Sequence, residues 1–256
     1  MRCIFITLAA FLLSVPAIAA DNTQSVLATP RQRVQTADFR ATGHLVRVEA
    51  NGSRTSYGIT IKAHWFPGIL CVFLEVTPPK ETKPDARAHI LLEMRPDGQN
   101  MIKIAHPGDE VPAILPISKW NNGPLGPGFS YEDFLESAFF WPTQKVAEET
   151  KYGARECDVL KSTPGPSDRT QYAQVRTWLD KSIGFPVYVE KTVKATGVLK
   201  EFTYYGLRHE GGVWSASQVE AKLRGIPGST LLIIDRGSAK ANLTLADFSS
   251  DRLTRF

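Results

Sequence analysis

The fold class is decided by one stretch, RVEANGSRTSYGITIKAHWF at residues 47–66. In its second half, apolar residues that include Ile59, Ile61 and Trp65 alternate with mostly polar ones. A period of two with one apolar and one polar set is typical of an antiparallel strand that buries one face. The Asn-Gly pair at 51–52 precedes this run and is the strongest short signal for a hairpin. The stretch therefore predicts two antiparallel strands joined by a tight turn.

The same pattern continues on both sides of the hairpin. Upstream, Val46 and Val48 alternate with charged residues. Downstream, strand-like runs separated by turns rich in glycine and proline cover residues 69–76, 89–95, 101–104, 143–150, 154–162, 171–180, 185–193, 199–208, 213–224 and 229–236. Short strands at this spacing indicate a meander, and a sheet of so many strands curls rather than staying flat. We therefore expect a mainly β chain whose curved antiparallel sheet forms an open barrel.

Three segments break the strand pattern. Residues 107–128 are rich in proline and glycine and predict a long loop, which in a compact domain is usually functional or mobile. Ser130, with Asp133 three residues later, resembles a capping box and predicts a short helix over 131–138. Residues 21–38 are polar and indicate a short helix or a segment that orders on docking.

The apolar phase of the strands indicates where a core or a ligand lies. If the sheet curls, this phase lines its concave side with Val46, Val48, Ile59, Ile61, Trp65, Leu70, Val72, Leu74, Ile90, Leu92, Met94, Ile102, Ile104, Val175, Leu179, Val187 and Val189. Each such side chain is worth roughly 1.5–3 kcal/mol when buried, so something must cover this face. Either protein side chains fill the hollow, or an apolar cavity for an acyl chain remains. The small amount of predicted helix favours the cavity.

The N-terminus has the layout of a secretory signal peptide. Arg2 supplies a positive start, residues 4–15 form an apolar run, and small residues at 17–20 precede Asp21. The apolar run is too short for an ordinary membrane span. We expect residues 1–20 to be removed and residues 21–256 to form one exported domain.

Charge and cysteine content narrow the choice of partners. The formal net charge is +4, and the basic residues are scattered rather than gathered in blocks, so the sequence shows no nucleic-acid footprint. Two cysteines, Cys71 and Cys157, remain after the expected cleavage, and an exported protein could join them. The strand phases place them on opposite faces, which argues against a disulfide.

No motif in the sequence indicates catalysis. The five histidines do not show metal-ligand spacing, and His64 and His89 fall on polar strand phases, where they are expected to face solvent. Ser130 lacks the glycines of a nucleophile elbow, and Asp180 stands where a strand ends, as turn-opening aspartates do. We therefore expect no enzyme, no cofactor and no metal site.

Several short motifs together resemble a known family. They are GPGFSYEDF at 126–134, GARECDVL at 153–160, WLDK at 178–181, PVYVE at 186–190 and GVWSA at 212–216. Their order and spacing are similar to those of the periplasmic outer-membrane lipoprotein-sorting proteins, relatives of the lipoprotein carriers LolA and LolB. The most specific block is Ser130, Tyr131, Glu132 and Asp133. The resemblance covers about residues 40–250.

The resemblance implies a half-barrel of antiparallel strands whose concave apolar face is lidded by short helices. In the lipoprotein carriers, that cavity holds acyl chains during transfer across the periplasm. By the same resemblance, this chain would be a monomeric periplasmic carrier with a lipid or a lipoprotein acyl chain as its ligand. An inner-membrane transporter or an outer-membrane acceptor would be a further partner. The alternative is a protein-interaction module, because the periplasmic regulator RseB has the same fold.

Overall fold

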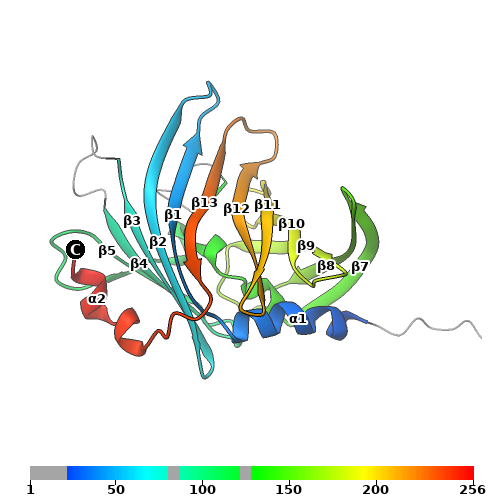
Figure 1. Cartoon of the computed structure of the whole chain (residues 1–256), viewed down its shortest axis with the longest axis horizontal. Coiled ribbons are helices and arrows are strands. Elements are labelled where there is room, and N and C mark those ends of the chain that lie inside the picture. The colour runs from blue at the N-terminus through cyan, green and yellow to red at the C-terminus, as the bar shows by residue number, and fades with distance from the viewer. Residues whose placement is uncertain (1–21, 80–86, 122–127) are drawn as a thin grey trace, which may run out of the picture.

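A single curved sheet of 13 strands, each antiparallel to its neighbours, forms the body of the molecule (Figure 1). The computed structural model describes residues 22–79, 87–121 and 128–256, so the expected signal peptide at 1–20 lies outside the described residues. The strands are β1 Asp38–Val48, β2 Arg54–Phe66, β3 Ile69–Thr77, β4 Ala88–Met94, β5 Met101–Ala105, β6 Ala113–Ile114, β7 Thr143–Tyr152, β8 Arg155–Thr163, β9 Tyr172–Asp180, β10 Pro186–Val193, β11 Leu199–Glu210, β12 Val213–Leu223 and β13 Ser229–Ser238. The predicted fold class, an open curved antiparallel sheet with short helices, is confirmed.

The helices are few and short. They are α1 Thr23–Gln35, α2 Ser250–Thr254, and the 3-10 helices η2 Ile117–Lys119, η3 Tyr131–Phe134, η4 Ser137–Phe140 and η5 Leu245–Phe248. The expected helix over 131–138 is wrong in detail, because Leu135 adopts an extended backbone that ends η3 and turns its side chain into the core. The result is two separate single turns, η3 and η4.

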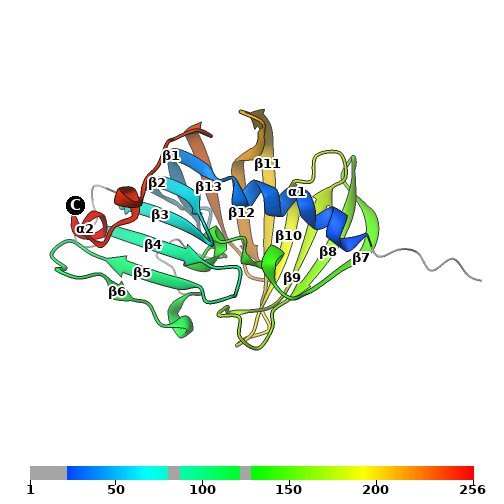
Figure 2. The same ribbon diagram turned by 90° about the horizontal axis from the view of Figure 1, so that it is seen from below.

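The path of the chain forces one segment across the concave side. Strands β1 to β6 run as a meander to one edge of the sheet, and β7 to β13 run back from the opposite edge until β13 pairs with β1. Because β6 and β7 are the two edges, the connection between them runs from one edge to the other, and its described parts lie on the concave side (Figure 2). We name the described parts of this connection, residues 115–121 and 128–142, the crossing segment.

The larger core lies on the concave side. Register places Ile59 and Ile61 directly opposite Gly43 and Ala41 of β1, and the same phase continues through the apolar residues of β3 to β5. Gly43 sits at a register shift between β1 and β13, where a Cβ atom would lie 1.9 Å from the Ile233 carbonyl oxygen. Glycine therefore allows the close backbone approach at this bulge.

Two of the residues expected on the concave side lie on the other face. Leu45, which is fully buried, belongs to the inner phase of β1. Val46 and Val48 stand opposite Ser56 and Arg54 and are only half-buried on the convex side. Their assignment to the concave side is wrong, because the register of the hairpin and not the alternation alone decides which phase points inward.

A second, smaller core lies on the convex side of β3, β4 and β5. The C-terminal helices η5 and α2 fold back over these strands, and Phe248 and Leu253 pack with Phe73 and Leu91 (Figure 1). His89 is buried beneath them, with Nδ1 2.8 Å from the Leu253 carbonyl oxygen. The expectation that His89 faces solvent is wrong, because the distant C-terminus covers the polar phase of its strand.

Both cysteines are buried and free. Cys71 belongs to β3 and Cys157 to β8, and seven strands separate β3 from β8 in the sheet. The prediction that they do not pair is confirmed, and their separation along the sheet is sufficient reason for it.

Candidate functional site under the crossing segment

The concave face is filled by aromatic side chains of the crossing segment. The crossing segment contributes four buried aromatic residues and one leucine to the inner core, namely Trp120, Phe129, Tyr131, Trp141 and Leu135. Phe129 packs edge-on against Phe202 of β11, with ring centroids 5.7 Å apart, and Phe140 stacks on Trp65 of β2 at 6.0 Å. The segment therefore replaces solvent in the hollow with the protein's own side chains.

The sheet brings together most of the residues that were expected to line its concave side. The buried core contains Ile59, Ile61, Leu70, Val72, Leu74, Ile90, Leu92, Met94, Ile102, Ile104, Val175 and Val189. Trp65 is only partly buried and packs at the margin of this core. These residues form one continuous apolar surface beneath the crossing segment.

Two of the expected residues are placed differently. Leu179 lies in a separate small cluster with Leu27 of α1, at one end of the hollow. Val187 is buried at a register shift between Pro186 and Tyr188, and Pro186 lines the interior in its place. A bulge adds one residue to a strand and shifts the alternation by one, which the apolar pattern does not reveal.

The space that remains under the crossing segment is small. A cavity of about 30 Å³ lies between η3, η4 and strands β9 to β11, and its lining includes Glu132, Asp133, Val175 and Val189. One buried water needs about 10–15 Å³ on this measure, so the cavity holds about two waters. An acyl chain is far larger than this cavity and could occupy it only by displacing part of the crossing segment.

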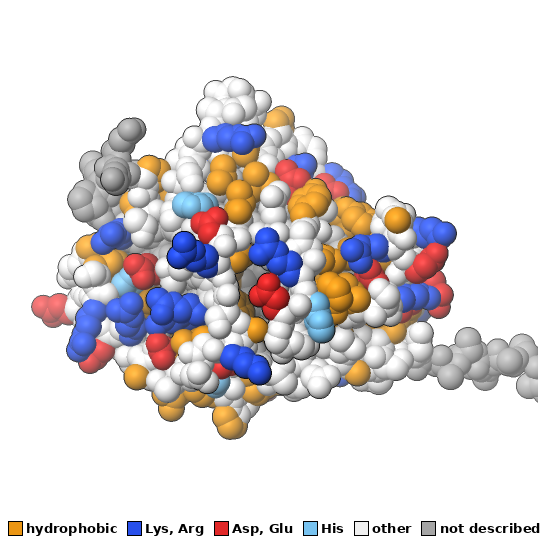
Figure 3. All heavy atoms as spheres, viewed as in Figure 1, with side chains coloured by type: hydrophobic (Ala, Val, Ile, Leu, Met, Phe, Trp, Pro, Cys, Tyr) orange, Lys and Arg blue, Asp and Glu red, His pale blue; other side chains and the backbone are white. Residues whose placement is uncertain are grey.

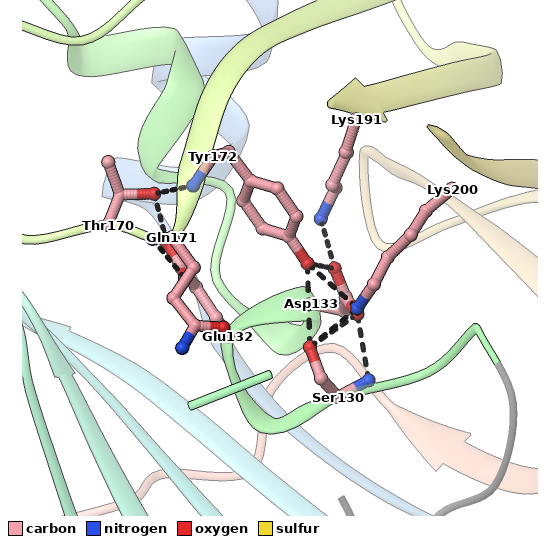
Figure 4. A network of polar contacts seen from close by, with 8 residues as sticks. All are labelled: Ser130, Glu132, Asp133, Thr170, Gln171, Tyr172, Lys191 and Lys200. Atoms are coloured by element: carbon pink, nitrogen blue, oxygen red, sulfur yellow. Dashed lines mark hydrogen bonds and ion pairs between the residues drawn. The ribbon is translucent and has the colours of Figure 1, made fainter. Parts of the chain in front are cut away.

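A buried charge cluster ties the crossing segment to the sheet (Figure 4). The Asp133 carboxylate is fully buried and lies 2.9 Å from Nζ of Lys191 and 3.0 Å from Nζ of Lys200. The hydroxyl of Tyr172 donates a hydrogen bond to the same carboxylate. Burial alone would raise the pKa of Asp133, but the two ammonium groups hold that pKa well below its usual range. Asp133 therefore stays ionised and bridges η3 to β9, β10 and β11.

Ser130 joins the cluster through its cap position. The expected capping box with Asp133 is present, and the Asp133 carboxylate accepts hydrogen bonds from the Ser130 N–H and hydroxyl, each at 2.8 Å. Nζ of Lys200 also lies 2.9 Å from the Ser130 hydroxyl oxygen. A serine beside a lysine can form a nucleophile–base pair. Here the ammonium already donates to Asp133 and has no lone pair to take the serine proton, so the geometry suits anchoring of the segment.

Glu132 is the second buried carboxylate of the motif, and it points to the start of β9. It accepts a hydrogen bond from the Thr170 hydroxyl and another, at 2.9 Å, from the Gln171 N–H. Burial raises the pKa of Glu132 to about 7. The side chain is therefore close to half-ionised at neutral pH.

Lys191 and Lys200 belong to the candidate site, and the sequence did not predict them as members of it. Lys191 falls in the inward phase of β10 with Val189 and Val193, and Lys200 falls in the inward phase of β11 with Phe202. A lysine in an apolar phase requires a buried partner, since an unpaired charge in a core is costly. The two lysines in apolar strand phases therefore indicate a buried acidic partner, but the sequence does not show that this partner is Asp133.

Gly128 positions the motif over the sheet. Its φ is +84°, and a Cβ atom there would lie 2.9 Å from the backbone of Ala221 in β12. Only glycine combines this left-handed conformation with such a close backbone approach. The glycine of the GPGFSYEDF motif therefore lets the chain cross β12 closely before η3 begins.

One family model, described as "Uncharacterized protein", matches residues 117–255, more than half of the 256-residue chain. The chain belongs to this family. The matched residues contain most of the crossing segment, the whole buried charge cluster and strands β7 to β13. No curated protein matches the sequence of the chain.

Solved structures of other proteins have the fold of this family member. An outer membrane lipoprotein-sorting protein domain from Vibrio parahaemolyticus is 18% identical, with a TM-score of 0.80 over 91% of this chain and 99% of that one. A DUF1329 family protein from Desulfovibrio piger is 14% identical, with a TM-score of 0.77 over 92% and 100%. A LolA superfamily protein from Nitrosomonas europaea is 14% identical, with a TM-score of 0.66 over 92% and 100%.

These likenesses confirm the expected LolA-like fold. At such low identities they establish the fold and leave the ligand open. None of the three structures is of RseB, so the relation to that regulator stays a prediction.

Three further features of the family member concern its possible ligands and its surface. Within the described ranges, no group of three or more His, Cys, Asp and Glu side chains could hold a metal ion. None of the helices in the described part of the chain has the length and apolar character of a membrane span. On the face seen in Figure 3, acidic and basic side chains are interspersed with apolar ones.

Proposed function

We propose that the protein is a periplasmic carrier that holds an acyl chain of a lipid or lipoprotein on the concave face of its sheet, beneath the crossing segment. The observation that carries this proposal is the continuous apolar face of β1 to β5 and β9 to β13, which in the described part of the chain is covered mainly by one irregular segment, with Val34 of α1 joining it. An ordinary β core would be covered by a second sheet or by regular amphipathic helices. The signal-peptide pattern at 1–20 supports export to the periplasm.

The construction of the crossing segment supports its displacement by a ligand. Its regular structure consists of three single turns, η2, η3 and η4, so few backbone hydrogen bonds hold it together. Within the described residues of the segment, the buried Asn121 Oδ1 and Trp141 Nε1 have no hydrogen-bond partner. Each such atom costs about 1–3 kcal/mol in the closed state. A few strong polar contacts at η3 thus hold the segment, whereas some of its buried polar atoms elsewhere lack a hydrogen-bond partner.

A protein-interaction module of this fold would bind a partner by adding a strand to an edge of its sheet. The two described edge strands disfavour such pairing. The long edge strand β7 presents charged side chains, among them Lys145, Glu148 and Lys151, and the other edge, β6, has two residues. Charged or very short edge strands are the usual protection against pairing with another chain. These edges favour the carrier over that alternative.

The test is native mass spectrometry of the mature protein purified gently from the periplasm, with lipid extraction of the same sample. A lipid or acylated peptide at near-stoichiometric amount is the expected result. A protein that stays free of lipid after incubation with membrane lipids would contradict the proposal.

Two matched variants locate the binding face. Val189→Thr puts an isosteric hydroxyl on the cavity lining, whereas Val46→Thr makes the same change on the convex side. An unpaired hydroxyl against an acyl chain costs about 1–3 kcal/mol, so Val189→Thr should weaken lipid binding by roughly tenfold and Val46→Thr should not. Equal affinity of the two variants would place the lipid elsewhere.

A further inference from the structure

A second and larger hollow lies outside the concave core, at the rim of the sheet. It has a volume of about 160 Å³ and is lined by one face of α1, the β9–β10 turn and the β11–β12 turn. We call it the rim groove. Its apolar lining is Ile183, Phe185, Val213 and Trp214, and its polar lining from α1 and the C-cap of that helix is Thr29, Gln32, Arg33 and Thr36. Gly184 allows this construction, because a Cβ atom there would lie 2.6 Å from the Thr29 side chain.

The charge of the rim groove is set by Arg33. Its guanidinium lies over the Phe185 ring, 4.9 Å from the centroid, and Nη2 pairs with Oε1 of Glu136 at 2.7 Å. Its Nε–H is buried and finds no acceptor among the described residues. Helix α1 contains Arg31 and Arg33 and no acidic residue. The groove therefore contains a cationic guanidinium, paired with one carboxylate, beside an apolar wall, which is the chemistry that holds an anion with an apolar tail.

The rim groove and the small inner cavity share one wall. Arg33 and Phe185 line the groove, while Glu136 and Tyr204 line the inner cavity. The ion pair between Arg33 and Glu136 joins the lining of the groove to the lining of the cavity. The Phe185 and Tyr204 rings also pack edge-on, with their centroids 5.9 Å apart. One ion pair and one pair of rings thus separate the groove from the concave face.

We infer that the rim groove binds the anionic head group of the amphiphile that the protein carries, with the tail running past the Arg33–Glu136 pair onto the concave face. The inference rests on the proposed function and adds the chemical class of the cargo, a carboxylate or phosphate attached to an acyl chain. Glu136 occupies Arg33 when the groove is empty, and the head group competes with it for the guanidinium. The Arg33 side chain is 19% exposed, so part of it is accessible to a head group in the groove.

The experiment compares oleate with oleyl alcohol, which has the same tail and no charge, by isothermal titration of the mature protein. The wild type should bind oleate at least tenfold more tightly than oleyl alcohol. Arg33→Gln should abolish this preference, while Arg40→Gln, which removes the same charge from an exposed position in β1, should keep it. Glu136→Gln removes the competing carboxylate and should raise the affinity for oleate several-fold, and this gain does not depend on the fold of the Arg33 variant.

The outcomes separate the two proposals. Equal binding of oleate and oleyl alcohol, unchanged in Arg33→Gln, overturns the head-group site and leaves the carrier function intact. Absence of binding for both amphiphiles overturns the carrier function, and the head-group site falls with it. Acetate bound as tightly as oleate overturns the assignment to an amphiphile, because the tail would then contribute nothing.

Discussion

Asp133 shows how single residues control this fold. Its carboxylate is fully buried, and two lysines, one tyrosine and the N-cap serine all bond to it. A buried charge of this kind is tolerated only when its partners are complete. The cluster therefore acts as one anchor, and removal of any member leaves the others poorly satisfied.

The first prediction concerns Lys200 and Asp133. Lys200→Met should destabilise the protein by about 3 kcal/mol, because it leaves the buried carboxylate short of one counter-charge. Combining it with Asp133→Asn should recover part of the loss, with a coupling energy of about 0.5–3 kcal/mol in a double-mutant cycle from urea unfolding. Strictly additive effects would show that the two groups do not interact.

The second prediction concerns Glu132 and pH. Its pKa is raised from 4.5 to about 7 in the folded protein, so the fold prefers the protonated form. The contribution of Glu132 to the free energy of unfolding is therefore greatest below about pH 4.5. It falls as the pH rises toward 7 and stays constant above about pH 8. The shift corresponds to roughly 3 kcal/mol.

Glu132→Gln tests this assignment. The amide oxygen can still accept from the Gln171 N–H and carries no charge, so the decline in the free energy of unfolding between pH 5 and 8 should largely disappear. Asp133 acts in the opposite sense, since its lowered pKa contributes stability that is lost only as the pH falls below about 4. A variant with the same decline as the wild type would assign the pH dependence to another group.

At the scale of elements, the crossing segment is decided by topology. Its aromatic residues fill the hollow because the two edges that it connects lie on opposite sides of the sheet. Secondary structure contributes little, since η3 and η4 are single turns. The segment depends on special positions such as Gly128, where it crosses close to β12.

Gly128→Ala should therefore cost more than an ordinary turn glycine. Gly153 in the β7–β8 turn is the matched control, because its φ is also positive and nothing lies within 4 Å of a Cβ atom there. Gly153→Ala should lower the free energy of unfolding by about 1 kcal/mol, from backbone strain alone. Gly128→Ala should cost clearly more and should speed hydrogen exchange in η3. Equal costs would mean that the contact with β12 gives way easily.

The strands could be predicted from the sequence, and the covering segment could not. Alternation and glycine turns are local, so the strand runs and most of the inward residues from Ile59 to Val189 are placed correctly. The pairing of β1 with β13, the bulge at Val187 and the C-terminal cover over His89 depend on contacts between distant residues. For the same reason the Ser130–Asp133 motif indicated only a helix cap, and its lysine partners appear only when the sheet is assembled.

The whole molecule should respond to a ligand in one region. If an acyl chain replaces the crossing segment on the concave face, hydrogen exchange at Leu135–Phe140 should become faster in the lipid-bound protein. Exchange in β1 and β13 at the centre of the sheet should stay the same and serves as the internal control. Slower exchange at Leu135–Phe140 in the bound state would mean that the ligand binds without displacing the segment.

The pairing of β1 with β13 also constrains the order of assembly. Val46 stands opposite Leu231, so the centre of the sheet joins residues from the two ends of the chain. During synthesis from the N-terminus, β1 has one neighbour, β2, until the last strand arrives, and until then the two halves of the sheet are separate wings. Such long-range closure slows folding. The inner core that joins β1 to β13 therefore cannot be completed on the ribosome before residue 238 has been synthesised.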